Sequence, residues 1–171
     1  MKKQKLTTKE LVLMGILVAV LEASKMALAF LPNVELVSFF IILYTVIFGN
    51  WIWPILVVFL ALEGLLNGFG LWWIMYAYVW PLLALAAFLC RKQKSTWFYS
   101  VLSGFFGLFF GGLCSFTYLF FGGVRTAFAW WIAGISYDLI HCVSNFILCL
   151  LLFRPLQRAL LQCRSLFKEN L

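Results

Sequence analysis

Charged side chains are scarce in this sequence. Asp, Glu, Lys and Arg make up 11% of its 171 residues, whereas 65% are hydrophobic and 19% aromatic. Soluble domains are roughly a quarter charged and half apolar. Too few polar side chains remain to cover a water-soluble globule, so the composition predicts an integral membrane protein. At about 20 residues per spanning helix, residues 1–171 have room for one membrane domain of about six helices and no appended soluble domain.

Histidine occurs once, as His141, and several enzyme motifs are missing. One histidine excludes an HExxH zinc site, and the cysteines lack metal-like spacing, so we expect no metal and no cofactor. Without a Walker-type phosphate loop, any ATP hydrolysis must take place on another subunit. Residues 134–138 begin like a GxSxG nucleophile elbow but end in aspartate. We therefore predict that the chain is not an enzyme and has no catalytic residues.

Apolar segments follow one another along the whole chain, and one pair of them is ambiguous. Residues 36–66 form either a single overlong helix or two short helices interrupted at Gly49, Asn50 and Pro54, because glycine and proline disrupt helical pairing. The predicted spans cover residues 11–31, 36–48, 51–66, 71–90, 97–121 and 127–153.

Lysine and arginine gather in the tail 1–10, in the loop 91–94 and in the tail 154–171, and they give the chain a net charge of +7. Such residues concentrate on the cytoplasmic side of membrane proteins. Six spans place all three clusters on that side, whereas five would separate them. We therefore predict an all-α six-transmembrane-helix bundle with both termini cytoplasmic. The basic residues then serve as topology determinants and lipid contacts, not as a nucleic-acid site.

An alternative for the amino terminus is a cleaved signal peptide, because a basic start precedes an apolar run and small residues. Glu22 and Lys25 would interrupt its apolar region. The first segment is better explained as a span. Glu22 and Lys25, three residues apart on that span, are expected to neutralise each other.

Polar residues in the apolar segments and in the loops between them converge on the outer side of this topology. A charge at membrane depth costs at least about 2.5 kcal/mol, so such residues usually face a protein interior or a wet cavity. We predict that they bind a substrate on the outer side, together with aromatic residues that could stack on a ring. The predicted substrate-binding residues are Asn33, Glu35, Glu63, Asn67, Trp72, Tyr76, Arg125, Trp131, Asp138, His141 and Asn145.

Two patterns in this set leave alternatives open. Asp138, His141 and Asn145 share one helix face, which is either a ligand-facing wall or a packing network in which Asp138 pairs with Lys25 or Arg125. Aromatic residues near helix ends are either ligand contacts or part of the aromatic belt found at membrane interfaces.

Small residues recur every four positions in the first span, at Gly15, Ala19 and Ala23. Such a stripe allows another helix to approach closely. It either serves internal packing or docks a partner subunit. A second small-residue face, Gly104, Gly107 and Gly111, is predicted to pack internally.

Taken together, these segments resemble the substrate-binding S components of energy-coupling factor (ECF) vitamin transporters. The resemblance covers nearly the whole chain, and the AxxxA docking motif of that family falls on Ala19 and Ala23. No single motif is diagnostic, so the order and spacing of four stretches carry the resemblance. These stretches are residues 17–23, 32–35, 63–70 and 134–141, the last leading to Asn145 and Phe146.

The resemblance implies a multi-pass protein of the bacterial plasma membrane that captures a vitamin on the outer side and topples against a transmembrane coupling (T) subunit. Two ABC-type ATPase subunits would drive the cycle. Cobalamin is the leading substrate expectation, followed by pyridoxine-like, thiamin-precursor and pantothenate ligands. The alternative is a membrane scaffold or assembly protein whose polar residues only hold helices together.

Overall fold

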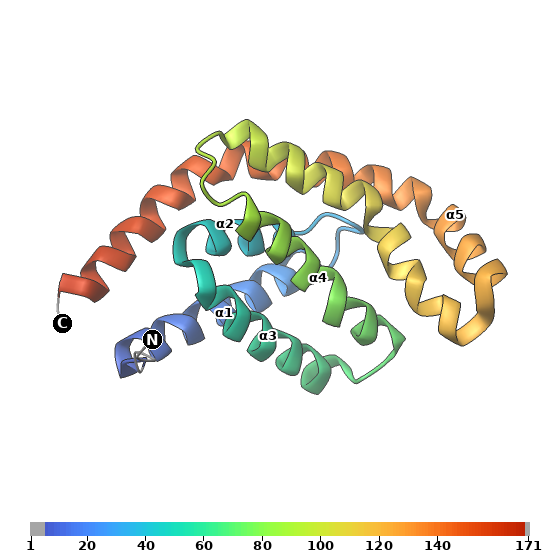
Figure 1. Ribbon diagram of the computed structural model, residues 1–171, viewed down its shortest axis with the longest axis horizontal. Coiled ribbons are helices and arrows are strands. Elements are labelled where there is room, and N and C mark those ends of the chain that lie inside the picture. Colours follow the sequence, from blue (N-terminus) through green and yellow to red (C-terminus); the bar gives the residue numbers. More distant parts are fainter. Residues whose placement is uncertain (1–5, 170–171) are drawn as a thin grey trace.

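The computed structural model describes the backbone of residues 6–169 and the side chains of residues 6–165. Regular structure in this part of the chain is entirely helical (Figure 1). The elements are α1 (Thr8–Leu28), α2 (Val37–Phe48), the short 3-10 helix η1 (Gly49–Trp51), α3 (Ile52–Asn67), α4 (Leu71–Leu89) and α5 (Thr96–Glu169). Four helical stretches are long and apolar enough to cross a membrane, namely Thr8–Leu28, Val37–Asn67, Leu71–Leu89 and Thr96–Ser165. The protein is therefore an all-α membrane protein.

Helix α1 begins and ends three residues earlier than the apolar run 11–31 predicted. A capping box fixes its start: the Glu10 amide donates to Thr7 Oγ1 at 3.3 Å, and the Thr7 amide donates to Glu10 Oε2 at 2.8 Å. These two bonds satisfy backbone donors that a helix start otherwise leaves unpaired. At the other end, Pro32 disfavours helical backbone in the residue before it, and the helix has already stopped at Leu28.

The segment 36–66 is interrupted at Gly49, as one of the two sequence alternatives predicted. Gly49 has a φ of 61°, which ends α2, and η1 leads into α3. Every residue of α2 except Val46 is buried. At 1.5 Å per residue, α2 is about 18 Å long, shorter than a membrane core of about 30 Å. The connection 29–36 leads into its amino-terminal end and lines a cavity there.

Helix α5 reverses direction at Gly123, where the backbone has a φ of 75°. Its two arms, residues 96–122 and 124–169, run back along each other (Figure 1). A Cβ atom on Gly107 would lie 2.7 Å from the backbone oxygen of His141. This close approach confirms that the glycine face of the first arm packs internally. The second arm continues past the predicted end at residue 153, because Leu156 and Leu160 still pack against the core.

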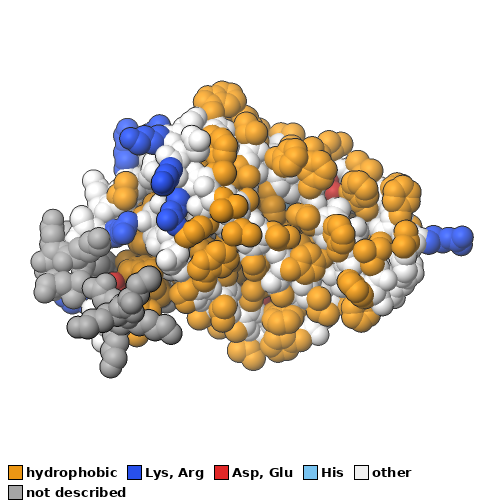
Figure 2. All heavy atoms as spheres, in the orientation of Figure 1, with side chains coloured by type: hydrophobic (Ala, Val, Ile, Leu, Met, Phe, Trp, Pro, Cys, Tyr) orange, Lys and Arg blue, Asp and Glu red, His pale blue; other side chains and the backbone are white. Residues whose placement is uncertain are grey.

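Basic side chains gather at one end of the molecule, and apolar side chains cover most of the rest of the visible face (Figure 2). Arg154 joins two of the basic clusters: its Nε donates to Thr96 Oγ1 at 2.8 Å, and its Nη2 donates to the Lys94 carbonyl at 3.2 Å. The α5 reversal lies at the opposite end (Figure 1). Lys2, Lys3 and Lys5 of the predicted basic tail lie outside the described residues, as does the side chain of Lys168.

Candidate ligand-binding site

A cavity of about 330 Å³ lies beyond the amino-terminal end of α2. Its walls come from α1, the connection 29–36, α2, α4 and both arms of α5. Tyr76, which lines the cavity, lies about 20 Å along α4 from Leu89, the helix end that leads to the basic loop. The cavity is therefore in the half of the molecule away from the basic clusters. Its lining residues are Lys25, Leu28, Ala29, Leu31, Pro32, Asn33, Val34, Glu35, Val37, Tyr76, Trp80, Phe110 and His141.

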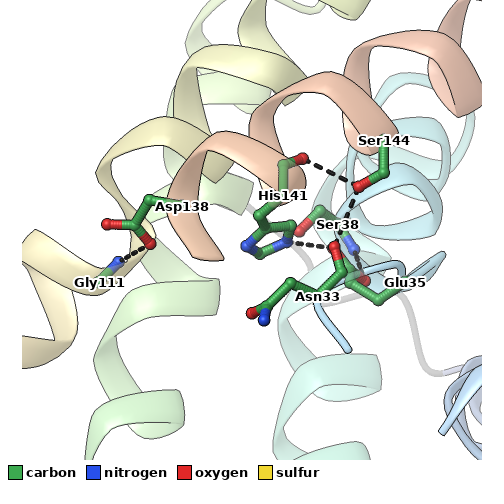
Figure 3. Close-up of polar contacts among 7 residues, drawn as sticks. All are labelled: Asn33, Glu35, Ser38, Gly111, Asp138, His141 and Ser144. Atoms are coloured by element: carbon green, nitrogen blue, oxygen red, sulfur yellow. Dashed lines mark hydrogen bonds and ion pairs between the residues drawn. The ribbon is translucent and has the colours of Figure 1, made fainter. Parts of the chain in front are cut away.

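The connection 29–36 is tied to α5 and α2 by hydrogen bonds over this cavity (Figure 3). Ser144 Oγ donates to the Asn33 carbonyl at 3.0 Å, and His141 Nε2 lies 3.1 Å from Glu35 Oε1. Asn33 adopts a left-handed backbone with a φ of 57°, a conformation that asparagine tolerates better than most residues. The contacts bring Asn33, Glu35 and His141 together, as the sequence predicted.

Glu35 is half-buried, and its carboxylate bonds both to His141 of α5 and to the start of α2. Burial opposes ionisation of its carboxyl, but the hydrogen bond and charge of His141 and the hydrogen bonds from Ser38 outweigh it. The pKa of Glu35 therefore lies below its ordinary value. Its Oε2 accepts a 2.8 Å hydrogen bond from the Ser38 amide at the start of α2, where the helix dipole favours a negative charge.

A second cavity of about 400 Å³ adjoins the first and shares Asn33 and Phe110 with it. Asp138 lies in its wall, and Asp138 Oδ1 accepts a 2.9 Å hydrogen bond from the Gly111 amide. A Cβ atom on Gly111 would lie 2.5 Å from Asp138 Oδ2. Only glycine lets the carboxylate approach the helix backbone so closely. The remaining lining residues are Trp130, Ala133, Gly134 and Tyr137.

Several buried polar atoms of α5 have no hydrogen-bond partner within the described residues. One is Ser103 Oγ of the first arm, and the others, on the polar face of the second arm, are Asp138 Oδ2, His141 Nδ1 and both side-chain polar atoms of Asn145. All four residues are at most 5% exposed. Buried polar groups are normally hydrogen-bonded, and each exception requires an explanation. Asp138 and His141 line the cavities and Asn145 lines neither, so the unpaired atoms of Asp138 and His141 favour the ligand-facing interpretation for that part of the helix face.

Lys25 pairs with Glu63 and not with Glu22, which corrects the sequence expectation. The Lys25 ammonium contacts the Glu63 carboxylate, which also accepts a 3.3 Å hydrogen bond from Asn67 Nδ2. The pair joins α1 to α3, because Glu63 is completely buried and Lys25 reaches it across the helix interface. Glu22 lies beside Glu63. Lys25 also lies 5.6 Å from the ring centroid of Trp72, a cation–π distance.

The alternative in which Asp138 pairs with Lys25 or Arg125 is wrong. Neither ion pair found in the described part of the chain includes Asp138. Arg125 is exposed next to the α5 reversal and lines neither cavity.

Other predicted site residues lie apart from the cavities. Glu63 and Asn67 belong to the Lys25 cluster, and Trp72 packs edge-on against Tyr76 at 5.4 Å between ring centroids. Trp131 is half-buried and lies against Gly112. Of the aromatic residues in the predicted set, Tyr76 alone lines either of these two cavities.

Sequence reasoning missed Trp80, Phe110 and Trp130 as cavity residues. The ring centroids of Tyr76 and Trp80 lie 4.1 Å apart. Phe110 packs edge-on against His141, with 4.9 Å between their ring centroids. Spacing offered one clue, because Tyr76 and Trp80 are four residues apart and so share a helix face. No comparable spacing distinguished Phe110 from the many other phenylalanines of α5. Lys25, which was assigned to a local charge pair, also lines the first cavity.

The small-residue stripe of α1 is on the surface. Gly15, Ala19 and Ala23 are exposed, and a Cβ atom on Gly15 would have no neighbour within 4 Å. This placement excludes the interpretation that the stripe packs internally within the described residues.

Comparisons with protein-family profiles, curated proteins and solved structures found no match to this chain.

Proposed function

We propose that this chain is the substrate-capture S component of an ECF-type vitamin transporter in a bacterial plasma membrane. The observation that carries the proposal is the pair of adjoining cavities, with buried polar atoms of α5 that lack protein partners. A concave, largely apolar pocket with a few convergent polar groups is typical of small-molecule sites.

The proposed topology has six membrane-crossing segments: α1, α2, α3, α4 and the two arms of α5. The basic residues at one end favour a cytoplasmic location for that end and for both termini. The cavities then open toward the outer side, where a capture subunit must bind its vitamin. The candidate substrates are those implied by the family resemblance: cobalamin, pyridoxine-like, thiamin-precursor and pantothenate ligands.

Docking to the transmembrane coupling subunit is assigned to the exposed stripe Gly15, Ala19 and Ala23. Small residues there leave a smooth helix surface on which a partner helix can approach closely. Two ABC-type ATPase subunits would supply the energy. Replacing Ala19 and Ala23 with Trp should abolish uptake by the reconstituted transporter while vitamin binding to the isolated subunit is preserved. Loss of binding in this variant would contradict the assignment, because the stripe would then support the ligand site.

The direct test is the thermal stability of the detergent-purified protein in the presence of B vitamins, their precursors and corrinoids. A ligand that binds only the folded state raises the melting temperature by mass action. A selective shift is expected. Absence of any shift, from protein shown by circular dichroism to be folded, would favour the alternative of a scaffold whose polar residues only hold helices together.

A further inference from the structure

We infer that the ligand of this site is a small aromatic heterocycle that is neutral or cationic and donates hydrogen bonds, not an anion and not a corrinoid. The inference rests on the proposed function and names the substrate class of the same site. It follows from the charges around the cavities, from an unpaired acceptor atom and from the size of the space.

Asp138 is the one charged group in the lining of the two cavities that has no counter-charge among the described residues. Lys25 is already bound to Glu63, and the His141 ring already contacts Glu35. Asp138 contacts neither lysine nor arginine among the described residues. An anionic ligand would have to break an existing ion pair or lie beside an uncompensated carboxylate, and like charges in such positions cost several kcal/mol. The acidic groups in the lining are Glu35 and Asp138, and the basic groups are Lys25 and His141.

Asp138 Oδ2 is an unpaired acceptor in the cavity wall, because an ionised carboxylate accepts hydrogen bonds and cannot donate them. His141 Nδ1 is an acceptor when the neutral ring donates its Nε2 proton to Glu35, and a donor when the ring is protonated. Figure 3 shows the His141 ring between Asp138 on one side and Glu35 on the other. A ligand that satisfies Asp138 Oδ2 must therefore supply an N–H or O–H donor, and a positive charge would compensate Asp138.

The size and lining of the space favour one ring or two fused rings. The cavities measure about 330 and 400 Å³, near the lower end of the range of about 300–1,000 Å³ for ligand pockets. Tyr76, Trp80 and Phe110 offer aromatic surface in the first cavity, and Trp130 does so in the second. A corrinoid, with four pyrrole-derived rings around a metal, greatly exceeds this space. The structure therefore argues against cobalamin, the leading expectation from the family resemblance.

Matched pairs of compounds test the charge rule. Nicotinamide and nicotinate share a ring, but the first carries a neutral amide donor and the second a carboxylate. In the second pair, pyridoxine is likewise the compound without a carboxylate and 4-pyridoxate is the carboxylate. Thiamin, a hydroxymethyl aminopyrimidine, pantothenate and cyanocobalamin complete the panel. Affinities are measured by thermal shift and calorimetry on the full chain in detergent. The neutral or cationic ring compounds should bind at least about tenfold more tightly than anions of the same size.

Asp138→Asn tests the role of the carboxylate. It should weaken binding of the best ligand by about tenfold and weaken a cationic ligand more than its neutral analogue. Arg125→Gln is the matched control, because Arg125 lines neither cavity, and it should leave the affinity unchanged.

The outcomes separate the inference from the proposed function. Tighter binding of an anion or of cyanocobalamin would overturn the substrate class and leave the capture function standing. Unchanged affinity in Asp138→Asn would overturn the role of Asp138. If no compound of the panel stabilises the folded protein, the capture function itself fails, and the inference fails with it.

Discussion

Two buried carboxylates have different surroundings, because one has a cationic partner and the other has none. Glu63, on α3, is fully buried and is paired with Lys25 and Asn67 through Oε2, while its Oε1 has no partner among the described residues. Asp138, on the second arm of α5, is nearly as buried, but it has only the Gly111 amide as a partner, and its Oδ2 has none among the described residues. The Glu63 carboxylate is part of a charge pair that joins two helices. The Asp138 carboxylate lines the second cavity without a counter-charge among the described residues.

The difference shows how a membrane protein can use the same chemical group for two tasks. A buried charge is costly unless it is paired and hydrogen-bonded. Pairing Glu63 removes most of that cost and fixes α1 against α3. An unpaired Asp138 retains the cost, which a donor or cation from a ligand can offset. We therefore expect changes at the Glu63 pair to alter stability most, and changes at Asp138 to alter binding.

Removing the cation of the pair should have the largest effect. Lys25→Met leaves the fully buried Glu63 without its counter-charge and beside Glu22, so we expect the free energy of unfolding to fall by about 3–5 kcal/mol. Chemical denaturation of the purified protein measures this loss. Because removal of both partners leaves no uncompensated charge, Lys25→Met combined with Glu63→Gln should recover most of the stability. A double variant as unstable as the single one would contradict the pairing.

A smaller loss is expected when a methyl group is added beside Asp138. In Gly111→Ala, the new Cβ would meet the Asp138 carboxylate at 2.5 Å. Either the Asp138 side chain rotates away and loses the hydrogen bond from the Gly111 amide, or the two arms of α5 separate locally, at a cost of about 1–3 kcal/mol. Gly134→Ala is the matched control, because a Cβ there has no neighbour within 4 Å. Thermal melts should separate the two variants, and equal behaviour would show that the close approach does not matter.

Much of the fold could be predicted from the sequence, because apolar runs in lipid have few alternatives to helices. The close-packed glycine face of α5 followed from residue type, whereas the interruption at Gly49 was one of two alternatives between which the distribution of basic residues decided. Helix ends were displaced where side-chain hydrogen bonds decided them, as at Thr7 and Glu10. The continuation of α5 past Pro155 was not anticipated, because the packing of Leu156 and Leu160 depends on helices distant in sequence.

The site was predicted in part for a similar reason. Asp138 and His141 stood out because polar groups in apolar segments require an explanation, and Asn33 and Glu35 because they lie in the outer loop on the same side of the topology. Their pairing could not be predicted. The sequence placed Lys25 three residues from Glu22, yet its partner is Glu63, which is 38 positions away. Which carboxylate remains unpaired is therefore a property of tertiary structure.

Asp138→Asn should change stability less than the two variants above. Asparagine can keep the hydrogen bond from the Gly111 amide through its side-chain oxygen and removes an unpaired buried charge. We expect the free energy of unfolding to stay within about 1 kcal/mol of the parent protein. A large loss, comparable to that of Lys25→Met, would place Asp138 in a structural network and remove the contrast between the two carboxylates.

The smallest effect is expected at Glu35, which lies in the connection over the cavity. Its pKa is below the ordinary value of 4.5, because hydrogen bonds from His141 and Ser38 outweigh burial. A lowered folded-state pKa means that the Glu35 contribution to stability is fully present above pH 4.5 and is lost as the pH falls through the lowered pKa. Glu35→Gln should therefore have a lower melting temperature than the parent protein at neutral pH. The difference between the two melting temperatures should disappear in acid below pH 4.5. A difference that stays constant in acid would show that the carboxylate charge does not hold the connection in place.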